Sequence, residues 1–184
     1  MSKPEWLIRS GQPNDRPLLA AFACADPAVD FEVQVEDFIR TQLIDWSFDP
    51  HAASGDPRLL LAFITATGEL FGVAAHERVT LGDGETTFDA TKLEVAAIAR
   101  PWQGHRFSTG ERASDVLMSA VMTDVSARVP PRDARVFGII HRDNHRSLAL
   151  CRRHGLVEEM SSPDPSYRRL MTEHRPRTHD NEHS

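Results

Sequence analysis

The sequence predicts one mixed α/β domain, with a mostly antiparallel central sheet that contains one parallel pair of strands and is flanked by helices. Three observations predict this class. Apolar segments of strand length alternate with segments of helical periodicity along residues 1–171. Two of the apolar segments, 58–66 and 70–81, are joined by a short turn that contains glycine and form an antiparallel hairpin. A long helix separates two further strands, 92–99 and 134–140, and such a crossover makes the joined strands parallel.

The elements before the hairpin are a strand and two helices. Residues 5–11 form a short strand, and residues 14–26 follow as a helix whose N-cap is Asn14 or Asp15. Residues 31–46 form the clearest helix, because one stripe of apolar side chains recurs at spacings of three and four. The stripe consists of Phe31, Val35, Phe38, Ile39, Leu43 and Trp46.

The elements after the hairpin complete the sheet. The strand over 92–99 is apolar nearly throughout, which places it in the centre of the sheet. Gly155 lies where a helix C-cap glycine belongs. Residues 172–184 are polar and unpatterned, so we expect a disordered tail. The other expected elements are a loop over 82–91, a glycine-containing loop over 100–110, helices over 111–129 and 144–154, and strands over 155–160 and 166–171.

Composition and charge narrow the function classes. The 184 residues are 40% hydrophobic and 26% charged, which is typical of a globular domain. The net charge of −6 argues against a general nucleic-acid binder. No apolar run approaches the roughly 18 residues of a membrane span, and the N-terminus lacks the apolar core of a signal peptide, so we expect a cytoplasmic protein. Cys24 and Cys151 fit no metal or disulfide spacing, and no metal site is predicted.

The loop over 100–110 is a candidate phosphate site. It opens into a helix N-terminus, where unpaired backbone amides and the helix dipole bind anions. Its candidate ligands are glycine amides, hydroxyls and polar or cationic side chains, namely Gln103, Gly104, His105, Arg106, Ser108 and Gly110. A plain connecting loop is the alternative.

The helix over 144–154 carries the second signal. Asn144 is a good N-cap residue directly after an apolar strand, and Ser147 and Cys151 lie one turn apart on one helix face. The arginines around them are Arg142, Arg146, Arg152 and Arg153. Taken singly, each residue also fits an ordinary surface helix, with Cys151 as a small buried side chain.

Together, the segments AAIARPWQGHRFS and VFGIIHRDNHRSLALCRRHGL resemble the cofactor-binding half of the GNAT superfamily of N-acetyltransferases, whose element order agrees over about residues 5–171. The family's later motif is occupied here by Asn144, Ser147, Cys151, Gly155 and Leu156. In the loop motif, which Gln103 and Gly104 begin, Arg106 replaces the middle glycine and Ser108 the last small residue. Arg106 would contact the pyrophosphate directly or block its usual approach. Cys151 replaces a tyrosine acid, so its thiol would donate a proton to the CoA thiolate or be inert packing.

The resemblance implies an acetyl-CoA-dependent N-acetyltransferase that acts on a small-molecule or protein amine. The thioester would lie where the two parallel strands splay at Ile98, and the backbone N–H of Ile98 or Ala99 would polarise its carbonyl. The pyrophosphate would bind the amides of residues 103–110, and Asn144 would contact the pantetheine or the acceptor. The amine would attack the thioester directly, without a covalent enzyme intermediate.

The reaction requires a group, or a water relay, that removes a proton from the amine. Glu94 is the first candidate, because it is an acid in the central strand and shares the face of Ile98 under period-two alternation. A partly desolvated carboxylate is the stronger base. The alternative is a glutamate at the wet end of the strand, paired with Lys92 or Arg100. The further candidates for the base are His76 and His141.

An acidic protein that binds CoA must supply cations locally, and the candidates are Arg100, Arg106, Arg142 and Arg146. The acids of the first helices indicate a cationic acceptor or only a solvated face; they are Asp30, Glu32, Glu36 and Asp37. Two other functions fit the sequence. One is a catalytically weak or inactive acyl-CoA-binding sensor or scaffold, and the other is an unrelated mixed α/β binding domain whose helix over 31–46 binds a partner. A homodimer is compatible with the sequence, which leaves the oligomeric state open.

Overall fold

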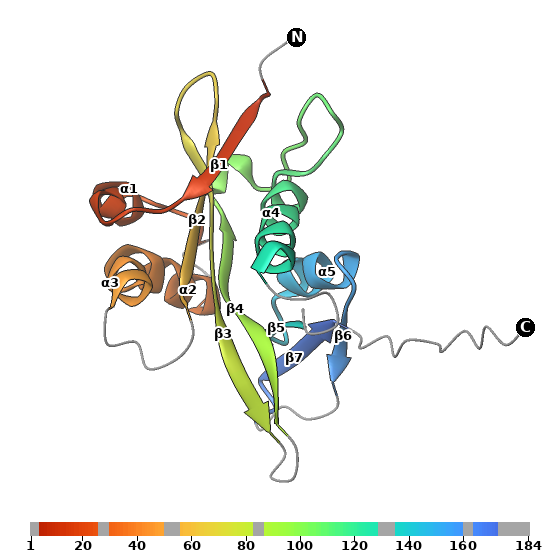
Figure 1. The fold of residues 1–184 in the computed structure, drawn as a ribbon. Helices are drawn as coiled ribbons and strands as arrows, with labels where there is room; N and C mark the ends of the chain where they lie inside the picture. Colours follow the sequence, from red (N-terminus) through yellow and green to blue (C-terminus); the bar gives the residue numbers. More distant parts are fainter. Residues whose placement is uncertain are drawn as a thin grey trace, which may run out of the picture.

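A computed structural model of the protein describes residues 4–25, 30–49, 56–82, 87–128, 135–159 and 164–172 (Figure 1). Its strands are β1 (Trp6–Ser10), β2 (Arg58–Ile64), β3 (Leu70–Gly82), β4 (Thr87–Ile98), β5 (Val136–His141), β6 (Leu156–Glu159) and β7 (Tyr167–Thr172). Its helices are α1 (Arg16–Ala20), α2 (Asp30–Thr41), α3 (Leu43–Phe48), α4 (Ala113–Arg128) and α5 (His145–Arg153), with 3-10 turns η1 (Pro13–Asp15) and η2 (Arg100–Trp102). The predicted tail after Thr172 lies outside the described residues.

The strands form one sheet in the order β1-β2-β3-β4-β5-β7-β6. Each neighbouring pair is antiparallel except β4 and β5, which are parallel. Helix α4 connects the parallel pair, as the strand–helix–strand pattern requires. The predicted mixed sheet with one parallel pair is therefore confirmed.

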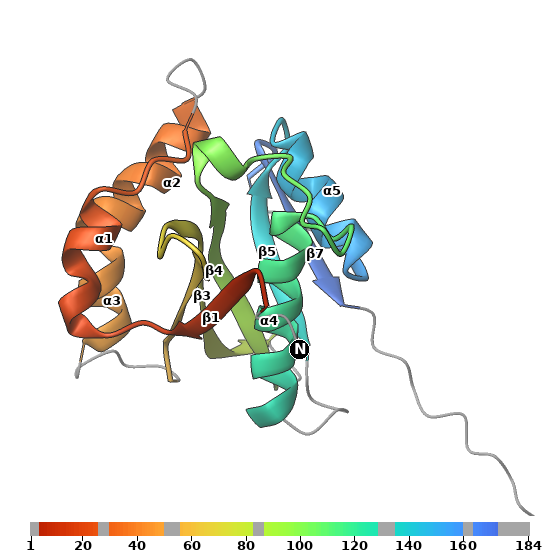
Figure 2. The same ribbon diagram turned by 90° about the horizontal axis from the view of Figure 1, so that it is seen from above.

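Helices cover both faces of the sheet. Figure 2 shows α1, α2 and α3 on one face, with α4 and α5 on the other. Alternation along β2 separates the two cores, since Leu59 and Leu61 pack toward α1–α3 whereas Leu60 and Ala62 pack toward α4. Within the described residues, no helix combines the length and the apolar character that a membrane span needs.

The first two predicted helices are shorter than expected. The helix predicted over 14–26 ends at Ala20, because the amides of Cys24 and Ala25 donate to Glu36 Oε2 at 2.7 and 2.8 Å instead of continuing the helix. These bonds hold the segment that follows α1 against α2.

The helix predicted over 31–46 is divided into α2 and α3 at Gln42, whose backbone (φ −122°, ψ −32°) leaves the helical region. Ile39 and Leu43, on either side of this break, are both buried. The apolar stripe therefore faces the core, as predicted, although two helices carry it.

Strand β4 begins at Thr87, so the loop predicted over 82–91 is mostly strand in its second half. Thr87 pairs with Gly82 of β3, and Asp89 Oδ1 accepts a hydrogen bond from Thr80 Oγ1 at 2.9 Å across the two strands. Polar side chains on a long, exposed hairpin gave this segment the composition of a loop.

Candidate functional site

The parallel strands β4 and β5 pair over a short length and then diverge. Their registered pairs run only from Thr91–Val136 to Leu93–Gly138, although β4 continues to Ile98. The divergence therefore begins at Leu93, and the prediction that the strands part at Ile98 is wrong. A cleft of about 870 Å³ opens at this divergence, between β4, β5, α2, α5 and the N-terminus of α4.

The open edge of β4 presents backbone donors to the cleft. The amide of Ala99 donates to Phe71 O of β3 at 2.8 Å. Because amides along an antiparallel strand point alternately to its two sides, those of Ala96 and Ile98 point away from β3 and toward the cleft. Of the two amides predicted to polarise a carbonyl, Ile98 can therefore do so, whereas Ala99 is already used in the sheet.

Glu94 is the extra residue of a β-bulge. It has no partner in β3, because the register shifts there between Leu93 and Val95. After the bulge the faces are exchanged, so that Leu93 and Ile98 both pack toward α4 while Val95 packs toward α1–α3. The prediction that Glu94 shares the face of Ile98 is therefore wrong. Glu94 lies on the α1–α3 side, next to Lys92.

Glu94 lines the cleft and is also paired. Its Oε2 lies 2.6 Å from Lys92 Nζ, and both side chains are partly exposed. Glu77 lies opposite Lys92 across β3 and β4, and burial, together with the Glu94 carboxylate, raises the pKa of Glu77. The ion pair with Lys92 that the sequence left open is therefore present.

His76 does not line the cleft and is fully buried beneath α4. Its Nε2 lies 3.1 Å from Asp124 Oδ2, and Arg128 Nη2 lies 3.3 Å from its Nδ1. Burial, helped by the charge of Arg128, lowers the pKa of His76 to about 4. The prediction of His76 as a further candidate for the base is wrong, because the imidazole cannot reach a substrate in the cleft.

His141 does line the cleft, where it lies between two aromatic rings. Its ring stacks on Phe31 of α2 at 4.8 Å between centroids and meets Tyr167 of β7 edge-on at 5.4 Å. The amide of Asp143 donates to His141 Nδ1 at 3.3 Å, so a neutral His141 carries its proton on Nε2. His141 is therefore arranged to donate a hydrogen bond rather than to accept a proton.

The loop between η2 and α4 uses many of its amides internally. The amides that donate to carbonyl oxygens of the same loop are those of Gln103, His105, Phe107 and Gly110. The amide of Ser108 donates instead to Glu5 Oε2 at 2.9 Å. His105, Ser108 and Gly110 also do not line the cleft, so these three predicted ligands face away from it.

The N-terminus of α4 remains as the anion-binding end of the cleft. Gly104 (φ +76°), Arg106, Arg112 and Ser114 line it. In the described parts of the chain, the amides of Gly104, Arg106 and Ser114 have no acceptor, and neither Arg106 nor Arg112 pairs with a carboxylate. Arg112 was missed by sequence reasoning because the helix was expected to begin one residue before it.

The side chain of Gln103 connects the two sides of the cleft. Its Nε2 donates to Cys24 O at 2.7 Å and to Ile98 O at 3.2 Å, and its Oε1 accepts from Arg146 Nη1 of α5 at 2.6 Å. The predicted contact of Gln103 with a phosphate would require these bonds to break. Of the four arginines predicted to supply charge, Arg106 and Arg146 line the cleft, whereas Arg100 and Arg142 do not.

Helix α5 forms the opposite wall. Asn144 is its N-cap, as predicted, because Oδ1 accepts from the amide of Ser147 at 3.1 Å. Both residues line the cleft. Cys151 is 2% exposed and packs among apolar side chains, and burial raises the pKa of its thiol to about 11. A thiol with this pKa is a weak proton donor for a CoA thiolate.

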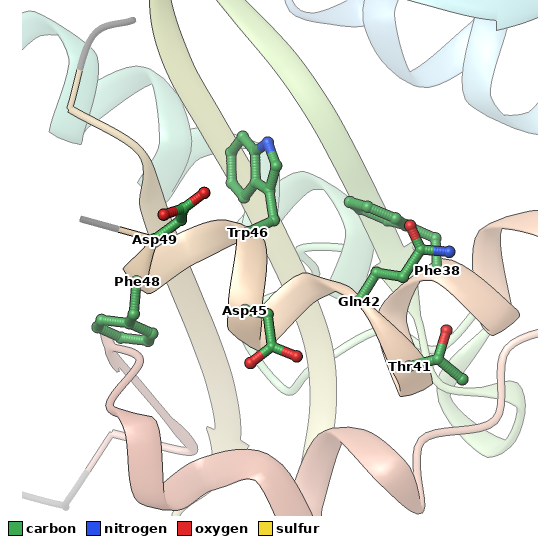
Figure 3. Close-up of a pocket in the computed structure, with 7 residues that line it drawn as sticks. All are labelled: Phe38, Thr41, Gln42, Asp45, Trp46, Phe48 and Asp49. Atoms are coloured by element: carbon green, nitrogen blue, oxygen red, sulfur yellow. The ribbon is translucent and has the colours of Figure 1, made fainter. Parts of the chain in front are cut away.

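A second pocket, of about 570 Å³, lies on the α2–α3 layer away from the open edge of β4 (Figure 3). In Figure 3, Asp45 points toward α1, where it pairs with Arg16, and Trp46 points toward the sheet. Its lining residues are Phe38, Thr41, Gln42, Asp45, Trp46, Phe48 and Asp49. This pocket holds none of the predicted site residues, so the chemistry is assigned to the cleft at β4.

Neither a family model nor a curated protein matches the sequence. Solved structures match it over nearly the whole chain. The PaiA N-acetyltransferase from Thermoplasma acidophilum, in complex with coenzyme A, aligns with a TM-score of 0.62 at 13% identity, covering 94% of this chain and 99% of that one. A mutant of the AtaT toxin, bound to the C-terminus of the antitoxin AtaR and acetyl-CoA, aligns with a TM-score of 0.59 at 15% identity, covering 91% and 92%.

A GNAT-family protein from Desulfovibrio desulfuricans aligns with a TM-score of 0.59 at 17% identity, covering 90% of this chain and 96% of that one. The interpretation as an unrelated mixed α/β binding domain is therefore wrong. The seven-stranded sheet, its diverging parallel pair and these likenesses agree. The chain has the fold of the GNAT superfamily of N-acetyltransferases.

Proposed function

We propose that the chain is an acetyl-CoA-dependent N-acetyltransferase that transfers an acetyl group directly to an amine. The observation that carries this proposal is one continuous cleft in which the open edge of β4 leads to an arginine-flanked helix N-terminus. A thioester and a diphosphate, joined by a pantetheine arm, require those two features in that order. Two structures with the same fold were solved with CoA or acetyl-CoA.

The N-terminus of α4 would hold the diphosphate of the donor. Gly104, Arg106 and Ser114 offer unpaired amides within the described residues, and the helix dipole adds to their attraction for an anion. A Cβ built on Gly104 would meet no atom within 4 Å, so its glycine is required by its positive φ rather than by crowding. Arg112 supplies charge where the departures from the loop motif removed glycine amides.

The open edge of β4 would hold the acetyl group. The amides of Ile98 and Ala96 donate to the carbonyl oxygen and stabilise the negative charge that develops there. The amine nitrogen bonds to the carbonyl carbon, the bond to sulfur breaks, and Glu94 accepts the proton that the amine loses. CoA leaves as a thiolate and takes a proton from water, and Cys151 serves as packing beneath α5.

A second candidate function is acyl-CoA binding without transfer. It is favoured by the Lys92–Glu94 ion pair, which lowers the basicity of the carboxylate, and by the burial of Cys151. Release of free thiol from acetyl-CoA, measured with and without a panel of primary amines, separates the two functions. Amine-dependent release supports transfer, whereas tight binding of acetyl-CoA without any release supports the sensor.

Arg112→Ala is expected to weaken acetyl-CoA binding about tenfold, because a charge-assisted contact to phosphate contributes on this scale. Arg106→Ala is expected to act in the same direction. For the wild type, the dissociation constant should rise steeply between about 50 and 200 mM salt, and the slope should be smaller in each variant. Isothermal titration calorimetry measures both quantities.

Arg152→Ala is the matched control, because Arg152 is an exposed arginine of α5 that pairs with Glu158 and does not line the cleft. Its affinity for acetyl-CoA should stay within twofold of the wild type. An affinity that neither salt nor Arg112→Ala changes would contradict the placement of the diphosphate at α4.

A further inference from the structure

An isoleucine in the interior of the sheet is exposed. Ile139 belongs to β5, which has β4 on one side and β7 on the other, yet 52% of its surface is accessible. Apolar side chains of interior strands are normally covered, so large exposed ones mark binding surfaces more often than structural ones do. Ile139 lines the same cleft as the open edge of β4.

The exposure follows from the way in which the helices cover the sheet. On the α1–α3 face, the core is built from side chains of β2, β3 and β4, such as Leu61, Val73 and Val95. No helix of the described residues packs on β5 at Ile139, beyond the edge of this layer (Figure 2). The sheet therefore presents an apolar platform beside the diverging strands.

Aromatic rings surround this platform. His141 is two residues from Ile139 along β5 and so lies on the same face, and Tyr167 is its direct partner in β7. Phe31 approaches from α2 and stacks on His141. All four side chains line the cleft. Glu94, at the bulge of the neighbouring strand, lies on this side of the sheet and lines the cleft as well.

We propose that the acceptor is a primary amine carried by an aromatic or branched apolar body, and that this body packs on Ile139 between the rings of Phe31, His141 and Tyr167. This inference rests on the proposed function, since it places the amine nitrogen at Glu94 and next to the thioester. The Lys92 ammonium already neutralises Glu94, which disfavours a polycation as the acceptor. The platform is one isoleucine and three rings inside a cleft, which is too small for a stable protein interface.

The test compares amines that differ in their apolar body. With acetyl-CoA as the donor, kcat/KM from thiol release should be at least tenfold higher for 2-phenylethylamine and isopentylamine than for ethanolamine, because burying an apolar group of this size selects on that scale. Ile139→Asn should lower kcat/KM about tenfold for the two apolar amines. It should leave the value for ethanolamine and the affinity for acetyl-CoA within twofold.

Val157→Asn is the matched control. Val157 is 42% exposed on β6 and does not line the cleft, so this variant makes the same kind of surface change and should leave all three amines unaffected. Because Ile139 is already exposed, its variant should fold, and an unchanged urea unfolding curve confirms this.

Two results would overturn the inference in different ways. Equal kcat/KM for ethanolamine and 2-phenylethylamine, or an equal loss for both in Ile139→Asn, would overturn the apolar acceptor and leave the acetyltransferase in place. Thiol release with none of the amines, despite binding of acetyl-CoA, would overturn the proposed function and the acceptor together.

Discussion

Glu94→Gln is expected to lower kcat for amine acetylation about a hundredfold, because a positioned proton acceptor contributes to catalysis on this scale. Glu94 stands at the bulge of β4 and lines the cleft beside the open edge of that strand. Glutamine keeps the shape of the side chain but cannot accept a proton. The affinity for acetyl-CoA should change less than twofold, so the loss should lie in kcat. Thiol release from about pH 6 to about pH 9 measures it, and the ascending limb of the profile should disappear.

Lys92→Met is the variant that separates proton transfer from packing. It removes the cation that lies 2.6 Å from the Glu94 carboxylate and keeps a side chain of similar length. The unpaired carboxylate is the stronger base, so the ascending limb should move to higher pH while the maximal kcat persists. A kcat of Glu94→Gln within twofold of the wild type at every pH would contradict the role of Glu94 and leave the proton to water.

The parts of the site that depend on local geometry were predictable. Asn144 is an N-cap because its short side chain reaches the amide of Ser147, and Gly155 (φ +81°) ends α5 because glycine adopts this conformation without strain. The parallel pair followed from the order of strands and helix. Each of these features is determined by residues within a few positions of one another or by the handedness of a crossover.

The bulge at Glu94 could not be predicted, because it depends on the register between two strands. Alternation within β4 alone places Glu94 on the face of Ile98, and only the pairing of Ala75 with Val95 shows the extra residue. The same shift determines that Glu94 meets Lys92. Long-range register thus determined the face of the candidate base.

The loop before α4 showed a signal that sequence reasoning used only in part. Arg106 and Ser108 depart from the glycines of the family motif, and in the structure Arg106 bridges to Arg112 while its side chain donates to Gly110 O at 2.7 Å. A loop that folds on itself uses the amides that a diphosphate would otherwise meet. The anion site therefore lies at the first turn of α4, where Arg112 was not expected.

The free energy of unfolding is expected to fall by about 3 kcal/mol between about pH 6.5 and about pH 4, because His76 is held neutral in the fold. Burial and Arg128 lower its pKa from 6.5 to about 4. In this window the unfolded chain binds a proton that the folded chain does not, so each step toward acid favours unfolding. The carboxyl groups of Asp56 and Asp115, whose pKa values are lowered by their ion pairs, act below this window. Urea unfolding at a series of pH values measures the slope.

His76→Gln isolates the contribution of the imidazole. A glutamine amide can donate to Asp124 and accept from Arg128, so the contacts of His76 can persist without a group that titrates. The acid-dependent loss should shrink to what other groups supply, among them Glu77, whose raised pKa acts in the opposite sense. His145→Gln changes an exposed histidine and should keep the slope of the wild type. If His76→Gln also kept that slope, the buried imidazole could not be its source, and the acid sensitivity would belong to the carboxylates.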